Sequence, residues 1–426
     1  MTGQTDLDGT AKTSARETWR DAPAAAKALI VGTFLHRLGG FLQIFMVLYL
    51  THRGFSSGQA GIALSLYGGG LSLGVLLGGW LSDRLGPRRT IVGSMALTAV
   101  LLPSVLYLDS YLAVVTVIAA IGAVGQAYRP ASTSALSQLI PHERHVMTFA
   151  MLRLATNLGT GIGPILGAAL VAISYDLLFW GEALAVLVFA GVAAVALRGE
   201  SRPEATARKA GSAPIPAEPA ADKRASYLDV LRDRRYLLFL VAIFVTTMVY
   251  IQHLATLPLA VVASGLGTTA YGVLVGLNGF IVIAFELLVA RRVQHWTPRA
   301  ATVAGVALTA VGMSVYGLPW GLVGFVLATT IWSFGETVGY PTLFFAYPAQ
   351  AGPAHLRGRY IGASNSIFGL GFALGPVVGV AVWNALGSAL WMWCGIAGLV
   401  AVVITAAGVV PKKADAVPKE LTGNEV

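Results

Sequence analysis

The sequence is poor in charged residues and in cysteine. Only 12% of its 426 residues are charged, whereas soluble globular proteins carry about 25%. A chain with so little charge cannot cover the surface of a water-soluble fold of this length. Cys394 is the single cysteine, which excludes an internal disulfide and a zinc site built from cysteines.

Motifs of enzymes and of ATP-driven pumps are also missing. The sequence contains neither G-x-x-x-x-G-K-[ST], which binds nucleotide phosphates, nor H-E-x-x-H, which binds zinc. Its G-x-G patterns lie inside apolar stretches and do not follow a strand, so a dinucleotide site is excluded. We therefore expect no enzyme activity, no cofactor and no metal site. The segment 1–26 is polar and has no signal-peptide core, so the first apolar stretch is expected to be a membrane helix.

Long apolar stretches make up most of the chain. Hydrophobic residues account for 56% of the sequence, and a helix of about 20 apolar residues crosses a bilayer. Stretches of this kind occur at 27–51, 57–81, 90–108, 111–138, 146–174, 177–197, 236–263, 270–292, 299–318, 320–348, 358–386 and 388–410. They are too long and too evenly apolar for barrel strands. The predicted fold is an all-α membrane protein with twelve transmembrane helices.

A polar segment divides the twelve stretches into two sets of six. It covers 198–235, is rich in Ala, Pro and charge, and predicts a linker with a short helix at 226–233. The predicted organisation is a tail at 1–26, a six-helix bundle at 27–197, this linker, a second six-helix bundle at 236–410 and a tail at 411–426.

Lys and Arg are distributed unevenly between the two sides of the predicted bundle. Of the 29 such residues, Arg53 alone lies in the loops of one side, three lie within spans, and all others lie on the side of the tails and the linker. Basic loops face the cytoplasm, so we expect a multi-pass cell-membrane protein with both termini in the cytoplasm. The net charge of +9 then reflects topology and contact with lipid headgroups, and not binding of nucleic acid.

The two halves repeat each other in sequence. A nearly constant offset pairs Gly61 with Gly272, Gly68 with Gly279, Pro130 with Pro341 and Gly163-Pro164 with Gly375-Pro376. A shared Gly- and Ala-rich composition explains single glycine matches but not the prolines in register. Because six spans is an even number, both halves start on the same side, as in the parallel repeats of secondary transporters. The proline pairs predict bends in the fifth and eleventh spans.

The loop after the second stretch carries a motif. Residues 78–89 read GGWLSDRLGPRR, which resembles the signature loop of the major facilitator superfamily, G-x-L-(A/S)-D-R-x-G-R/P-R/K-R/K. The chain is most similar to the bacterial drug:proton antiporter branch, through NLGTGIGPILG (157–167) and RPA (129–131). The resemblance implies two pseudo-symmetric six-helix bundles, alternating access, and a cavity lined by spans one, four, seven and ten.

The signature loop is implied to act as a gate. In the family it joins the two halves on the cytoplasmic side when the outward-open state forms. Asp83 would interact with the start of the eleventh span, and Arg144 or Arg357 would pair with it; a purely topological loop is the alternative. The equivalent second-half loop has Gln294 at the Asp position, so a weaker latch is expected there. The other residues to which the resemblance gives a gating role are Gly79, Arg84, Gly86, Arg88 and Arg153.

Ionisable side chains within spans are costly and are candidates for function. The acids in the second half are Glu336 and Glu286, whereas the bases Arg37 and Arg129 lie in the first half. Glu336 lies in the tenth span shortly before Pro341, where a helix is expected to bend, and is the first candidate for the coupling proton. Glu286 is the second candidate, with a simple ion pair to a neighbouring base as the alternative.

A cavity with a basic wall and an acidic wall suits an anionic or zwitterionic substrate. Arg37 and Arg129 can bind a carboxylate or phosphate, or serve as structural ion-pair partners. His36 and His253 can relay protons or hold helices together. Glu182 is assigned a structural role, because the resemblance places the sixth span on the lipid side. The neutral candidates for substrate binding are Gln43, Gln252, Asn278 and Tyr340.

The leading functional prediction is a proton-coupled secondary transporter that exports small amphipathic drugs or metabolites. It is expected to work as a monomer, with a small-molecule substrate, protons and membrane lipid as its partners and no nucleic acid. A transporter of one anionic or zwitterionic metabolite, which would use Arg37 or Arg129, is the alternative. A lipid flippase or a receptor on the same scaffold is a third possibility.

Overall fold

The computed structural model describes residues 15–141, 144–198, 227–348, 350–353 and 356–409. Within these ranges the regular structure is helical, without a strand, and twelve spans are long and apolar enough to cross a membrane. The predicted all-α fold is therefore confirmed. Most of the predicted tails and of the linker, 199–226 included, lies outside the described residues.

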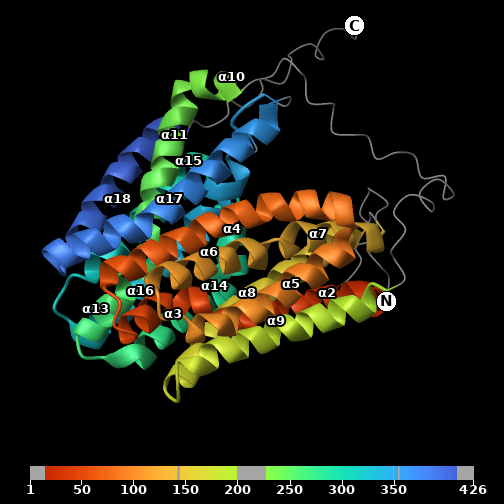
Figure 1. Ribbon diagram of the computed structural model, residues 1–426. Helices are drawn as coiled ribbons and strands as arrows, with labels where there is room; N and C mark the ends of the chain where they lie inside the picture. The colour runs from red at the N-terminus through yellow and green to blue at the C-terminus, as the bar shows by residue number, and fades with distance from the viewer. Residues whose placement is uncertain (1–14, 142–143, 199–226, 349, 354–355, 410–426) are drawn as a thin grey trace, which may run out of the picture.

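The first half is preceded by a short helix, α1 (Ala15–Asp21), and contains six spans (Figure 1). These are α2 (Ala24–Leu38) with α3 (Phe41–His52), α4 (Ser57–Leu85), α5 (Pro87–Ser104), α6 (Tyr111–Gln126) with α7 (Tyr128–Leu139), α8 (His145–Val171) and α9 (Asp176–Ala196).

The second half is also preceded by a short helix, α10 (Tyr227–Arg232), where the sequence predicts one. Its spans are α11 (Arg234–Tyr250) with α12 (Gln252–Ala255) and α13 (Leu257–Ala263), α14 (Gly267–Val293), α15 (Pro298–Val315), α16 (Gly321–Pro341) with a π-helical turn (Thr342–Ala346), α17 (Arg357–Leu386) and α18 (Ala389–Gly408). α11 begins slightly before the predicted span because Asp233 caps it, accepting hydrogen bonds from the amides of Arg235 and Tyr236.

Local sequence sets the bounds of α4 and fixes the signature loop. Ser56 and Gln59 form a capping box at its first turn, each side chain bonding the other's backbone amide. The helix ends at Gly86, whose φ of +85° suits glycine, and Pro87 starts α5 at once. The loop is therefore a sharp turn between two long helices.

The two halves meet through glycine and proline residues in matching places. Gly61 of α4 lies against the carbonyl oxygen of Pro376 in α17, and Gly272 of α14 lies against that of Pro164 in α8. Both glycines and both prolines belong to pairs that the sequence repeat brings into register. The contacts α4–α17 and α8–α14 are thus equivalent under the pseudo-two-fold relation between the halves.

Three of the spans that the structure describes are divided into consecutive α-helices. The first breaks at Gly39-Gly40, the fourth at Ala127 and the seventh at Ile251. By contrast, α8 and α17 continue as single helices through Pro164 and Pro376, the two places where the sequence predicts bends.

The glycines of the two Gly-Pro pairs face two of these breaks. Gly163 packs on the carbonyl oxygen of Leu38, at the end of α2, and Gly375 packs on Ile251. Close packing by glycine thus places each Gly-Pro pair directly beside an interruption in the neighbouring span of its own half.

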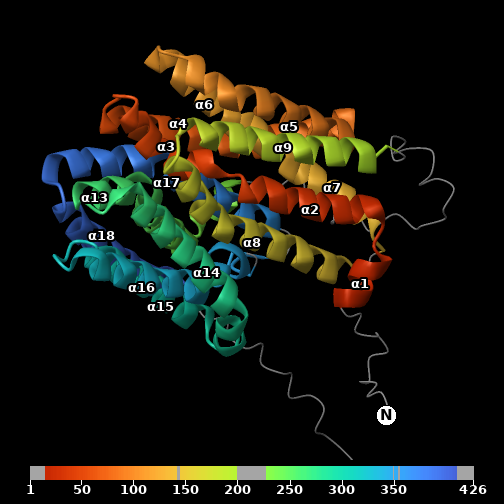
Figure 2. The same ribbon diagram turned by 90° about the horizontal axis from the view of Figure 1, so that it is seen from below.

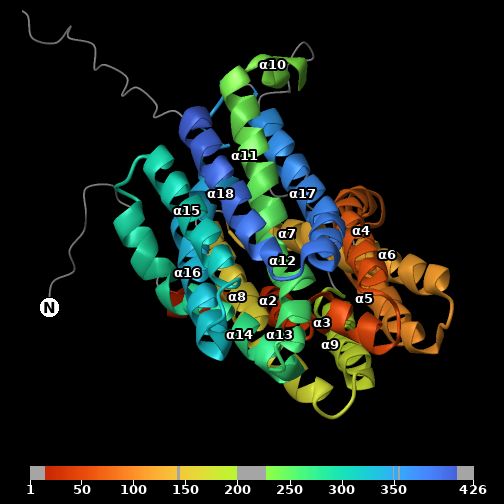
Figure 3. The ribbon, with the colours of Figure 1, turned by 90° about the vertical axis from the view of Figure 1, so that its left-hand side faces the viewer.

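The two ends of the bundle differ. We call the end with α1, α10 and Gly86 the linker side, and the end with Ser57 and Asn384 the closed side. On the closed side Ser57 donates a hydrogen bond of 2.8 Å to Asn384 Oδ1, from α4 to α17. Figure 1 shows these two helices together at the left and well apart at the right, toward the linker side. Figure 3 looks at the closed side, where α3 lies beside α12 and α13.

Candidate substrate cavity and gating residues

A cavity of about 270 Å³ lies between the two halves, near the interruptions of the first and seventh spans. Its walls come from α2, α3, α4, α5, α6, α8 and α9 of the first half and from α11, α12, α14, α16 and α17 of the second. Figure 2 shows α8 and α14, which form one junction of the two halves, running side by side. The predicted site residues that line this cavity are His36, Arg37, Gln43, His253, Asn278 and Glu336.

The second-half wall carries Glu336 among neutral partners. Asn278 of α14 donates a hydrogen bond of 3.0 Å to Glu336 Oε2, and the hydroxyl of Tyr250 lies 3.4 Å from Oε1. The amide of Asn278 is also 3.0 Å from Ser333 Oγ, which fixes its orientation. Among the residues that the structure describes, Glu336 has no basic partner. Its carboxyl group can therefore exchange a proton without the rupture of an ion pair.

An aromatic group lies beside Glu336. The ring of His253 packs on Tyr250 and Trp332, with centroid distances of 4.5 and 5.2 Å. Its Nδ1 atom is 2.6 Å from the carbonyl oxygen of Tyr250, which only accepts, so this nitrogen carries a hydrogen. Trp332 in turn donates to the hydroxyl of Tyr316 at 2.8 Å. This arrangement holds His253 at the cavity wall in one orientation.

The first-half wall carries polar atoms without a hydrogen-bond partner in the part of the chain that the structure describes. His36 Nδ1, Arg37 Nε and Gln126 Oε1 are buried and make no hydrogen bond to any described residue. All three side chains line the cavity. Buried polar groups are nearly always hydrogen-bonded, so this wall offers a ligand the donor of Arg37, the acceptor of Gln126 and a ring nitrogen of His36.

Glu182 lines the cavity as well, which the sequence analysis did not predict. It is 5% exposed, and its Oε2 accepts a hydrogen bond of 2.7 Å from the amide of Leu42, at the start of α3. The signal that could have found it is the Gly39-Gly40 pair. A break there leaves backbone amides without helical acceptors, and an acid in a neighbouring span is a suitable acceptor.

Four residues predicted for substrate binding or proton coupling lie outside the cavity lining. Gln252 donates to the carbonyl oxygens of Met248 and Gly375, at 2.8 and 2.9 Å, and so joins α12 to α17. Tyr340 is buried, with its ring against that of Tyr250. The other two, Arg129 and Glu286, occupy α7 and α14.

Glu286 and Arg153 form an ion pair across the two halves, from α14 to α8. Asn157, one turn further along α8, donates a hydrogen bond of 3.0 Å to the second carboxylate oxygen of Glu286. One residue predicted for proton coupling and one predicted for gating are thus brought together. The side chain of Arg153 is 61% exposed and that of Glu286 is 18% exposed, so the pair lies at the border of the packed interface.

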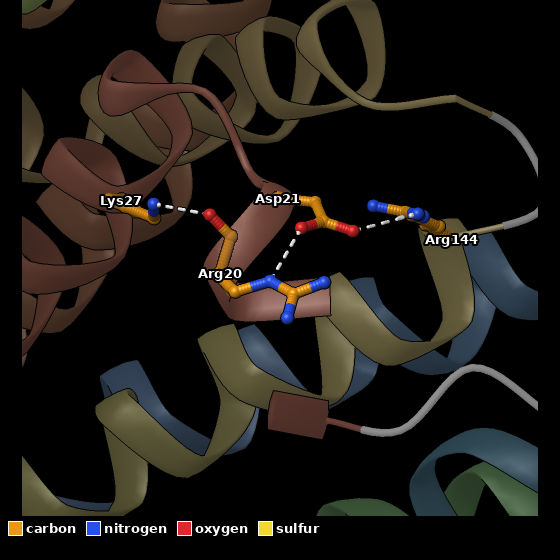
Figure 4. A network of polar contacts seen from close by, with 4 residues as sticks. All are labelled: Arg20, Asp21, Lys27 and Arg144. Carbon is orange, nitrogen blue, oxygen red and sulfur yellow. Dashed lines mark hydrogen bonds and ion pairs between the residues drawn. The ribbon is translucent and has the colours of Figure 1, made fainter. Parts of the chain in front are cut away.

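The signature loop is not engaged with the second half in this conformation. Asp83 is exposed and makes no ion pair with any described residue, and Arg357, one of its expected partners, is exposed too. Arg144, the other, is 3.2 Å from Asp21 of α1 (Figure 4). Two bases of the loop contact the first half: Arg84 stacks on Trp80, and Arg88 donates to the carbonyl oxygen of Ala194 in α9. Gly79 faces open space.

Comparison with known proteins identifies the family. The family model described as Major Facilitator Superfamily matches residues 29–376. The chain belongs to the major facilitator superfamily. It is accordingly a multi-pass membrane transporter and not an enzyme, as the sequence predicted.

Curated relatives of this transporter match it over most of their length at low identity. An uncharacterized MFS-type transporter, YqjV of Bacillus subtilis (strain 168), is 23% identical over 85% of this chain and 87% of its own. A Na(+), Li(+), K(+)/H(+) antiporter of Planococcus maritimus is 22% identical, over 86% and 92% of the two chains. The multidrug resistance protein MdtH of Aeromonas hydrophila is 24% identical, over 84% and 86%.

Solved structures share the fold of this major facilitator. A D-xylose-proton symporter superposes with a TM-score of 0.73 at 15% identity, covering 92% of this chain and 98% of its own. A peptide transporter POT in complex with sulfate gives a TM-score of 0.70 at 16% identity, covering 92% and 97%. At these identities the likeness establishes the arrangement of helices alone.

Proposed function

We propose that this transporter exports a small amphipathic drug or metabolite in exchange for protons, by alternating access. The observation that carries the proposal is the position of Glu336, on the cavity wall between the halves and held by the neutral side chains of Asn278 and Tyr250. A carboxyl group in such a place can bind a proton or lose it as the cavity content changes. Relatives named as a cation/proton antiporter and a multidrug resistance protein support the same choice.

The shape of the molecule supports alternating access. The halves are in contact on the closed side and separate toward the linker side, and they meet through equivalent pairs of helices. Rocking of two such repeats about a central site would open the closed side and bring the halves together on the linker side. Both walls of the cavity come from one chain, so we propose that the monomer is the working unit, in the cell membrane with both termini in the cytoplasm.

The test is transport in proteoliposomes with an imposed pH gradient. Ethidium and other fluorescent amphipathic cations are the probes, and a trapped pH-sensitive dye reports protons. We expect the gradient to drive probe movement and the probe to drive proton movement. Glu336→Gln should abolish gradient-driven transport but retain probe counterflow. Gln43→Glu, which adds a carboxyl group to the opposite wall of the same cavity, is the matched control and should not restore coupling in the Glu336→Gln background. Full coupling in Glu336→Gln would refute the proposal.

A second candidate is a carrier of an anionic or zwitterionic metabolite. It is favoured by the buried, unpartnered atoms His36 Nδ1, Arg37 Nε and Gln126 Oε1 on the first-half wall. A guanidinium group binds a carboxylate through two parallel hydrogen bonds, and an ammonium group cannot. Thermal stabilisation by succinate, phosphate and amino acids should then be lost in Arg37→Lys. Stabilisation by ethidium, unchanged in that variant, would favour the amphipathic exporter instead.

A further inference from the structure

A carboxylate from another span closes the break in the first span. In an uninterrupted helix the amide of Leu42 would donate to the carbonyl of Leu38, but the helix stops at Leu38 and restarts at Phe41. The amide of Phe41 bonds back to the carbonyl of Gly39 at 2.7 Å in a tight turn. The amide of Leu42 donates instead to Glu182 Oε2 at 2.7 Å. Glu182 thereby occupies the positive end of the α3 dipole.

The equivalent break in the second half is closed by a neutral group. At Ile251 the side-chain amide of Gln252 donates to the carbonyl oxygens of Met248 and Gly375. Its own oxygen accepts from the hydroxyl of Thr256 at 3.2 Å. An amide does not titrate, whereas a carboxylate does. His253, the titratable group at the second-half break, donates from Nδ1 to the carbonyl oxygen of Tyr250 and keeps this hydrogen when its ring is protonated. Of the two closures, the first-half one is therefore the one whose hydrogen bond depends on a proton.

The turn that Glu182 holds leads directly to the closed side. Two residues after Leu42, the carbonyl oxygen of Ile44 accepts a hydrogen bond of 3.1 Å from the hydroxyl of Tyr271 in α14. The same hydroxyl lies 3.2 Å from the carbonyl oxygen of His253. Phe45 packs its ring edge-on against Tyr271, which is fully buried. A short stretch of α3 thus connects a cavity acid to the contact that joins the halves.

Few other charges face Glu182. His36 and Arg37 of α2 and Tyr67 of α4 share its cavity wall, and Tyr128 and Arg129 of α7 lie close enough to interact electrostatically with Tyr67 and His36, respectively. The residues that α3, α5, α6 and α8 present to this cavity are neutral. Glu182 forms no ion pair with a described base, so a proton does not have to displace one.

We propose that Glu182 is a proton-responsive positioning residue that controls the closed side through the first turn of α3. A protonated carboxyl group accepts hydrogen bonds more weakly than a carboxylate, so a proton from the cavity loosens Leu42 and with it the contact between Ile44 and Tyr271. The proposal goes beyond the coupling role of Glu336 and requires no substrate.

The experiment measures opening of the closed side without transport. Spin labels are placed at two exposed closed-side positions, Ser110→Cys in the first half and Thr269→Cys in the second, in a Cys394→Ala background. Electron–electron distances are recorded in lipid nanodiscs from alkaline to acidic pH, with no ligand. We expect the longer-distance population to grow as the pH falls.

Three variants separate the explanations. Glu182→Gln keeps an acceptor for Leu42 but cannot titrate, so the pH response should be lost. Glu182→Asp keeps a titratable group and should retain a response with a displaced midpoint. Glu336→Gln should retain the pH response of the closed side. This expectation does not depend on whether Glu336 or another residue couples transport to protons. A full response in Glu182→Gln, or none in the parent, overturns the proposal.

A measurement on the unchanged protein provides a second test that needs no variant to fold. Hydrogen exchange of the amides of Phe41, Leu42 and Gln43 should become faster, relative to intrinsic rates, as the pH falls. The backbone amides that follow the second-half break at Ile251, which the side chain of Gln252 closes, should show no such change. Equal behaviour at the two breaks would contradict the role of Glu182.

Discussion

Gly161 of α8 and Gly279 of α14 pack backbone against backbone, with no side chain between these two residues. A Cβ atom added to Gly279 would overlap the Cα of Gly161, and one added to Gly161 would lie 2.8 Å from Ile283 Cδ1. Because overlap with backbone is not relieved by a rotamer change, the helices would have to move apart.

Gly279→Ala is therefore expected to weaken the junction of the halves. Overpacking costs about 1–3 kcal/mol, and each 1.4 kcal/mol corresponds to a tenfold change in an equilibrium. We expect a fall of about tenfold in the transport rate, measured in proteoliposomes with equal protein content. Gly93→Ala is the control, because a Cβ there meets nothing within 4 Å. Equal loss in both variants would show that helix content, and not the junction, is responsible.

Tyr271→Phe should open the closed side more often. The variant removes a buried hydroxyl that bridges Ile44 and His253, leaving their carbonyl groups without this donor, at a cost of about 1–3 kcal/mol. The longer-distance population between labels at Ser110 and Thr269 should increase at every pH. Tyr111→Phe, which removes a hydroxyl bonded to Gln59 within the first half, should leave that population unchanged.

The pair Arg153–Glu286 should behave as a weak link between α8 and α14. Because Arg153 is largely exposed, its contribution is expected to be at most about 1 kcal/mol. Arg153→Glu and Glu286→Arg should each lower the thermal midpoint in detergent, and the exchanged double variant should recover part of the loss. Arg299→Gln, a charge change outside this pair, serves as the baseline. If the double variant falls by the sum of the single effects, the two side chains do not interact.

The contact of α1 with the start of α8 should persist at all but strongly acidic pH. The hydrogen bond from Arg20, at 3.0 Å, and that from Arg144 hold the pKa of Asp21 below its ordinary value. The ionised Asp21 carboxylate therefore stabilises this contact at every pH above the ordinary pKa of an aspartate. The stabilisation is lost as the pH falls through the lowered pKa that Asp21 has in the folded protein.

A spin label at Trp19→Cys, in the Cys394→Ala background, reports this contact as label mobility. Asp21→Asn should raise mobility at neutral pH, as strong acid does in the parent, and Arg144→Gln should do the same. Arg357→Gln, in the other half, should have no effect. An Asp21→Asn label as immobile as the parent's would show that α1 is held by other contacts.

The course of the spans through the membrane was predictable because it depends on the hydropathy of long segments, to which many residues contribute. The apolar stretches, the loop between the second and the third of them and the repeat of Gly61 in Gly272 follow from composition and spacing, and the structure has all three. The interruptions at Gly39-Gly40 and Ile251 were not predicted. The first is closed by Glu182 from a distant span, and at the second Gln252 joins its own span to the carbonyl oxygen of Gly375 in α17, so neither can be read from the local sequence.

The candidate site was predictable in part, because charged residues within apolar stretches are easily recognised in a sequence. The cost of burying charge pointed to Glu336 and Arg37, which the structure places on the cavity wall. It did not indicate which side of a helix each polar residue occupies, so Gln252 was grouped with substrate ligands, and Glu182 was placed toward lipid. The pairing of Asp83 depends on the conformational state, which a sequence does not specify.

The glycines of α8 alternate between two partners. Gly159 and Gly163 face the end of α2, whereas Gly161, between them, faces α14. A rotation of α8 that improved its fit on one side would spoil the fit on the other, and a one-residue insertion, which turns the following residues by about 100°, would move the glycines away from both partners. Evolution or engineering can therefore alter this helix only together with both of its neighbours, and homologues with a bulkier residue at one of these positions should carry a compensating change in a different half of the chain or in the first span.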